Sequence, residues 1–114
     1  MTSQAFDRVF RLWKAHVSHT QVLLRSPKRD GTQRNVDIRF VDVEYLELPT
    51  ILRGVRLLPP EPSEIAGVEA RMGKSVNPGF VHVLETNGRR HIVVAASMSV
   101  EENDFEAIDW PLEI

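Results

Sequence analysis

Four histidines are the side chains whose spacing comes closest to that of a metal site. His16 and His19 are three residues apart at the end of a segment that we expect to be helical. Both rings lie on one helix face if the helix continues through His19, and they do not if it ends at Ala15 or His16. His82 and His91 flank a two-residue turn, which would make them diagonal neighbours with Cβ atoms roughly 7 Å apart. A zinc site needs three or four ligands, and the local sequence offers neither pair a third. We therefore predict no metal and no cofactor, and these pairs remain the candidates for a metal-dependent or histidine-based enzyme.

No other motif predicts catalysis. The chain has no cysteine, which excludes disulfides, thiolate metal sites and cysteine nucleophiles. No serine has the Gly-x-Ser-x-Gly context of a nucleophile elbow. Gly73-Lys74-Ser75 resembles the end of a phosphate-binding loop, but the upstream glycine, Gly67, is one residue too far away for that motif. We assign no catalytic residue and expect a protein that is not an enzyme.

Charge is distributed unevenly along the chain. Residues 1–39 carry eight Lys and Arg against three Asp and Glu, whereas residues 40–114 carry six against thirteen. We expect the two halves to attract each other within one fold. The alternative is a bipolar surface that steers a charged partner. The partner-binding candidates are the acidic residues near the C-terminus: Glu101, Glu102, Asp104, Glu106 and Asp109.

Basic side chains also gather over residues 25–39, where they would line one hairpin. They are Arg25, Lys28, Arg29, Arg34 and Arg39. Binding of single-stranded nucleic acid favours aromatic side chains between such cations, because bases stack on them. None is interleaved here, so nucleic-acid binding is the second alternative and we expect no nucleic-acid partner.

The length of 114 residues is typical of a single domain, residues 1–114. No apolar run reaches the roughly 18 residues that a membrane-spanning helix needs. Charged residues interrupt the first segment, which is therefore unlike a signal peptide. We expect a cytoplasmic protein with no membrane partner.

The first segment has apolar residues at helical spacing. Phe6, Val9, Phe10, Trp13 and Val17 recur every three or four positions, and Ser3 is suited to capping a helix N-terminus. The pattern predicts an amphipathic helix over residues 4–16 that packs on a sheet.

The central part alternates with a period of two. Residues 20–26 and 36–40 predict a hairpin whose polar loop covers residues 27–33. The apolar phase slips after Phe40, which predicts a β-bulge near Phe40–Val41 or burial of both faces. Residues 51–58 could add a short strand. Residues 63–72 are compatible with strand or helix, and Pro62 before them and Gly73 after them favour a helix.

Asn87-Gly88 between two β-branched runs is the strongest hairpin signal, because a type I′ turn needs positive φ at both central residues. This turn pairs Thr86 with Arg89, Leu84 with His91 and His82 with Val93. One face then carries Val81, Val83, Ile92, Val94, Ala96 and Met98, which we expect to be the core face. The other face, with both histidines, is half polar and is expected to be partly covered.

Together these elements predict an α+β fold: an N-terminal amphipathic helix packed on a mostly antiparallel sheet of two β-hairpins, with one short helix between them. The function that we expect is a non-enzymatic binding or interaction module, immunity- or adaptor-like, whose acidic C-terminal surface meets a protein partner. Self-association into a homo-oligomer is a further expectation, since the half-apolar hairpin face needs a cover.

Overall fold

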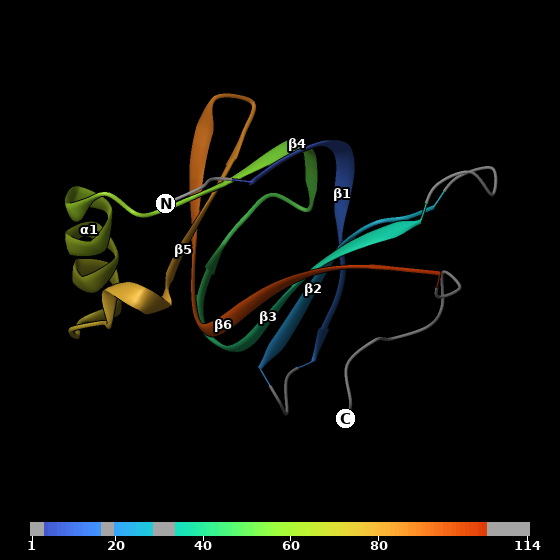
Figure 1. Cartoon of the computed structure of the whole chain (residues 1–114). Helices are drawn as coiled ribbons and strands as arrows, with labels where there is room; N and C mark the ends of the chain where they lie inside the picture. The colour runs from blue at the N-terminus through green and yellow to red at the C-terminus, as the bar shows by residue number, and fades with distance from the viewer. Residues whose placement is uncertain (1–3, 17–19, 29–33, 105–114) are drawn as a thin grey trace.

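The computed structural model describes residues 4–16, 20–28 and 34–104, and within them six strands close into an antiparallel barrel (Figure 1). The strands are β1 (Gln4–His16), β2 (Gln21–Ser26), β3 (Asn35–Glu47), β4 (Ile51–Leu58), β5 (Val81–Thr86) and β6 (Arg89–Asn103). Their order around the barrel is β1-β2-β3-β6-β5-β4, and β4 pairs with β1 to close it. One α-helix, α1 (Pro62–Met72), and a short 3₁₀ turn, η2 (Pro78–Phe80), lie between β4 and β5.

The predicted α+β fold is wrong. Residues 4–16, expected to form a helix packed on the sheet, form strand β1, and the sheet closes into a barrel. The strand is irregular and contains two β-bulges. The pairing of β1 with β4 shifts between Phe6 and Val9, and its pairing with β2 shifts between Leu12 and Lys14. Each bulge inserts an extra residue into the strand alternation. Phe6, Phe10 and Leu12 pack with the barrel core, as alternate residues of a strand do. Phe6 and Phe10 are four residues apart, a separation that also puts two side chains on one face of a helix, so their spacing does not distinguish the two structures. The suggested cap, Ser3, lies outside the described residues.

The antiparallel sheet and its two predicted hairpins are confirmed. β2 pairs with β3, and β5 pairs with β6 in the predicted register, with Leu84 opposite His91 and His82 opposite Val93. Asn87 and Gly88 have φ values of 52° and 73°, as a type I′ turn requires. The phase slip in β3 is an irregularity slightly later than predicted, with Asp42 at φ 56° and a register shift between Val43 and Tyr45.

Both faces of the β5–β6 hairpin are buried, so the predicted division into a core face and a half-covered face needs correction. Leu84, Val93 and Ala95 point into the barrel and belong to its core (the barrel core). The alternate residues Val81, Val83, Ile92 and Val94 point outward and form a second cluster with Val68 of α1 (the outer core). Figure 1 shows α1 beside β5, outside the barrel. The face that we expected to be half covered is the inner wall.

Helix α1 is capped at both ends and tied to β6 by an ion pair. Gly73 ends it in the left-handed conformation at φ 72°, and its N-cap is Glu61. Arg90 of β6 donates two hydrogen bonds of 2.9 Å to the Glu64 carboxylate, one from Nε and one from Nη2. Such a bidentate pair fixes both distance and orientation. It therefore sets how α1 sits against the outer core.

None of the helices in the described residues is long and apolar enough to cross a lipid bilayer.

The Asn87-Gly88 turn can be tested by a pair of Gly→Ala substitutions. An added Cβ meets no atom within 4 Å at Gly88 or at Gly67, so only backbone conformation separates the two sites. Gly88→Ala should lower the free energy of unfolding by about 1 kcal/mol, because φ is positive there. Gly67→Ala, inside α1, should raise it by about 0.5–1 kcal/mol, since alanine favours helix over glycine. Urea unfolding measures both, and equal effects would contradict the left-handed turn.

The ion pair between Glu64 and Arg90 should make the free energy of unfolding depend on pH in the acidic range. The hydrogen bond from Arg90 lowers the pKa of Glu64 below its ordinary value of 4.5, against a smaller opposing effect of burial. The ion pair therefore contributes fully to the free energy of unfolding at pH values above 4.5. This contribution is lost as the pH falls through the lowered pKa that Glu64 has in the folded protein. The difference in unfolding free energy between wild type and Glu64→Gln should be constant from neutral pH to about pH 5 and narrow below it. A difference independent of pH would contradict the assignment.

Candidate functional site

The barrel wall opens where β4 and β5 part. Their ladder runs from Arg56–Glu85 to Leu58–Val83 and then stops. Beyond Leu58 the chain continues as Pro59-Pro60, and proline has no backbone N–H to donate to a neighbouring strand. On the facing side, η2 leads into β5, so Val81 and His82 have no partner on β4.

A pocket of about 280 Å³ occupies this gap (the β4–β5 pocket). Its walls come from residues 57–60 of the β4 end, from Pro78 and Gly79 of η2 and from residues 81–83, with Gln4 and Met98 completing it. Almost all of this lining is apolar. Among the described residues that line the pocket, Gln4 and His82 are the two with polar side chains.

His82 is held by the barrel core. It lies on the same face of β5 as Leu84, and its ring centroid is 5.9 Å from that of Phe40, a buried residue of the barrel core. The Nε2 atom of His82 is 3.0 Å from the carbonyl oxygen of Ala95 on β6. A carbonyl oxygen only accepts hydrogen bonds, so Nε2 carries the proton and donates it. The ring is therefore fixed in position and in tautomer.

The two connections to α1 frame the pocket. Pro59 and Pro60 lead into the helix and Pro78 and Gly79 follow it, so both sides of the opening belong to the chain around α1. Arg90, which binds Glu64, also donates from Nη2 to the carbonyl oxygen of Pro59 at 3.2 Å. The ion pair that seats the helix thus also holds one wall of the pocket.

The structure places one of the two histidine pairs. His82 and His91 are diagonal neighbours in the β5–β6 ladder, as predicted. No group of three or more His, Cys, Asp or Glu side chains suited to a metal ion occurs in the part of the chain that the structure describes. His16 is the last residue of β1, and His19 lies outside the described residues, so no arrangement of that pair is assigned.

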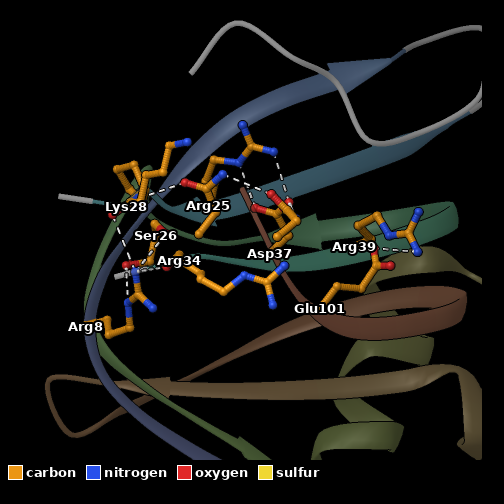
Figure 2. Close-up of polar contacts among 11 residues, drawn as sticks. Arg8, Arg25, Ser26, Lys28, Arg34, Asp37, Arg39 and Glu101 are labelled. Atoms are coloured by element: carbon orange, nitrogen blue, oxygen red, sulfur yellow. Dashed lines mark hydrogen bonds and ion pairs between the residues drawn. The ribbon is translucent and has the colours of Figure 1, made fainter. Parts of the chain in front are cut away.

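The first basic candidate, Arg25, is fully buried. Its Nε and Nη2 donate to the two carboxylate oxygens of Asp37, at 2.7 and 3.0 Å, and neither side chain has exposed surface (Figure 2). Its guanidinium carbon also lies 5.7 Å from the centre of the Trp13 ring. Asn103 of β6 donates to Asp37 at 2.6 Å, which ties a third strand to the pair. Arg25 has no surface to offer to a nucleic acid.

The other described basic candidates lie beside the acidic ones, because β3 pairs with β6. Arg39 forms a 2.7 Å ion pair with Glu101, and Arg34 lies 3.3 Å from Asp104. The Lys28 ammonium donates to the backbone oxygen of Asp104 at 2.7 Å. The charged halves of the sequence therefore attract each other within the fold, as expected. Glu102 is exposed, whereas Arg29, Glu106 and Asp109 lie outside the described residues.

A second hollow lies along β4 near the Asn87-Gly88 turn, and it is more open and more polar than the β4–β5 pocket. Arg53 and Arg56 line it together with Asp7 and Glu85, so its charges balance. Arg56 already faces Glu85 at 3.4 Å. This arrangement gives no net attraction for a charged ligand.

The sequence analysis missed the β4–β5 pocket, although the prolines carried a signal. Pro59-Pro60 directly after one apolar strand and Pro78 shortly before another mean that neither strand can extend its ladder there. What the sequence does not show is that these two strands are neighbours. Arg8 was also missed: it binds Ser26 Oγ at 2.9 Å and the backbone oxygen of Arg34 at 2.8 Å, across the base of the 27–33 loop (Figure 2).

The buried pair should be far more sensitive to mutation than an exposed one. Asp37→Asn leaves the Arg25 guanidinium buried without its counter-charge and should lower the free energy of unfolding by about 3 kcal/mol or more. The same change at Asp104, whose ion pair with Arg34 is exposed, should cost less than about 1 kcal/mol. Urea unfolding of both variants makes the comparison, and equal losses would contradict the burial of Arg25 and Asp37.

No protein-family model, curated protein or solved structure matches this chain, so its function has to be argued from its own geometry.

Proposed function

We propose that this protein is a non-enzymatic binding module that takes a small, mostly apolar molecule into the β4–β5 pocket. The observation that supports this most directly is the pocket itself, an apolar hollow of about 280 Å³ with one fixed histidine in its wall. Ligand sites in proteins are typically apolar clefts with a few placed polar groups, and the mouths of β-barrels are among their preferred positions.

The way the wall is built also supports a site that exists before the ligand arrives. The prolines that keep β4 and β5 apart fix their own φ angles, and His82 is held by Ala95 and Phe40. The Arg90 side chain holds Pro59 and α1 together. A preformed pocket loses little conformational entropy when it binds, which favours affinity for a small ligand.

Recognition of a protein partner through the acidic C-terminal residues remains a prediction with less support from the geometry. Glu101 and Asp104 are each paired with an arginine of the same chain. A basic partner would have to break these pairs or rely on residues such as Glu102. Their neutralisation weakens the long-range attraction on which such a partner depends.

Two substitutions at Met98, which lines the pocket and packs against the barrel core, test the proposal. Met98→Trp adds bulk where the ligand would lie, whereas Met98→Leu keeps the volume nearly unchanged. With 2-naphthol as the probe, amide signals of Leu58, Val81 and His82 should shift on titration in an NMR spectrum. Met98→Trp should weaken binding by about tenfold or more, and Met98→Leu should not.

Thermal unfolding of both variants supplies the control, because a Met98→Trp protein that has lost its fold says nothing about the pocket. Folded Met98→Trp protein that binds 2-naphthol as well as wild type does would contradict the proposal. So would shifts confined to residues distant from the pocket.

A further inference from the structure

We infer that the β4–β5 pocket selects an uncharged molecule that carries one hydrogen-bond donor, such as a hydroxyl group or an N–H, on an apolar body. The acceptor on the protein is Nδ1 of His82. This inference rests on the proposed function and adds to it the chemical class of the ligand.

The first step is the proton on His82. Because Nε2 donates to the carbonyl oxygen of Ala95, a neutral ring has its lone pair on the other nitrogen, Nδ1. The bond to Ala95 and the tilted contact with Phe40 prevent the ring from exchanging its two nitrogens without breaking both contacts. His82 is therefore an acceptor wherever Nδ1 is reachable.

The second step is that Nδ1 is reachable. Across residues 4–16, 20–28 and 34–104, the hydrogen bond to Ala95 is the one that His82 makes, and it uses Nε2. Nδ1 is also not among the side-chain atoms that are buried without a partner, which in these residues are Gln21 Oε1 and Arg39 Nε. An unpartnered nitrogen that is not buried, on a side chain that lines the pocket, faces the pocket or the solvent at its opening.

The third step is the absence of a cation to hold an anionic ligand. None of the described residues that line the pocket is a lysine or an arginine. Arg90, which holds the Pro59 wall of the pocket, is engaged by Glu64 and by the Pro59 carbonyl oxygen. Moving a carboxylate into an apolar pocket without a counter-charge is unfavourable. The lining therefore favours an uncharged ligand over an anionic one.

The donor matters because it fixes orientation and selects between ligands of one shape. A ligand without a donor leaves Nδ1 facing an apolar surface and loses the hydrogen bond that water provided there. A ligand with a donor replaces that bond. Sites built around a polar partner discriminate in this way more sharply than sites that offer apolar contact alone.

The test compares three probes of one ring system on the full chain: 2-naphthol, 2-methoxynaphthalene and 2-naphthoate. The first has a donor, the second has none, and the third is an anion. Titrations at about pH 8, where an ordinary histidine ring is neutral, give dissociation constants for wild type and for His82→Gln. The glutamine amide keeps a donor for the Ala95 carbonyl oxygen but lacks the acceptor at the place of Nδ1.

In wild type we expect 2-naphthol to bind about tenfold more tightly than the methyl ether, and in His82→Gln we expect that preference to fall to about one. The ¹⁵N signals of the His82 ring should show the Nε2–H tautomer, and the Nδ1 signal should move when 2-naphthol binds. A purely structural role for His82 would lower the affinity for both neutral probes equally and leave their ratio unchanged.

The remaining outcomes separate this inference from the proposed function. Equal binding of 2-naphthol and its methyl ether to wild type would overturn the role of Nδ1 and leave the pocket as a binding site. Tightest binding of 2-naphthoate would overturn the uncharged class of ligand. A failure of all three probes to shift any signal around the pocket would overturn the proposed function itself.

Discussion

The pairing of β1 with β4 is the constraint on which the rest of the structure depends. It joins the two ends of the strand order, so the described sheet closes on itself. Closure removes the exposed edges that an open sheet would present to other chains. It also gives the sheet an inside, which the barrel core fills, and an outside, which faces water wherever nothing covers it. On the outside of β5 and β6 the side chains are apolar, and α1 covers them.

Closure is interrupted where proline prevents it. A ladder between β4 and β5 that continued past Leu58 would need donors that Pro59 and Pro60 lack. The wall therefore opens near one end of the barrel, between two segments that also lead to and from α1. The prolines after Leu58 thus account for the end of the ladder, for the pocket beside it and for the point where the chain leaves the barrel toward α1. Arg90 links them physically, since one guanidinium group binds both the helix and the pocket wall.

The sequence was sufficient for features set by neighbours along the chain. Asn87-Gly88 determined a hairpin and its register, and Gly73 marked the end of α1, because positive φ is a local requirement that few residues meet. β1 was misread because Phe6 and Phe10 are four residues apart, a separation that puts two side chains on one face of a strand as well as of a helix. The irregularity of the strand, with its two bulges, was not visible either. Bulges form where a strand meets its partners, and the partner of Ala5 is Arg56, far along the chain. No local pattern encodes such a pairing.

The candidate site was missed for the same reason. The prolines at residues 59, 60 and 78 were visible, and the His82–Val93 pairing was predicted, but the neighbouring positions of β4 and β5 follow only from closure. The burial of Arg25 was equally invisible, since a cation among other cations in a sequence predicts an exposed charge. Its partner, Asp37, lies directly opposite it across the β2–β3 ladder, where a cross-strand pair of opposite charge is favourable.

Basic and acidic side chains on β3, β6 and their ends form ion pairs with each other, and this limits which partners the protein can recognise by charge. The antiparallel pairing of β3 with β6 places Arg34 and Arg39 next to the acidic end of β6, and the resulting ion pairs cross the ladder. A partner recognised by charge would have to compete with these contacts before gaining any of its own. A ligand of the β4–β5 pocket meets apolar walls and a nitrogen without a protein partner, so it displaces only water. Displacing water costs less free energy than breaking ion pairs. This is the physical reason to look for the function of this barrel in the β4–β5 pocket and not among its paired surface charges.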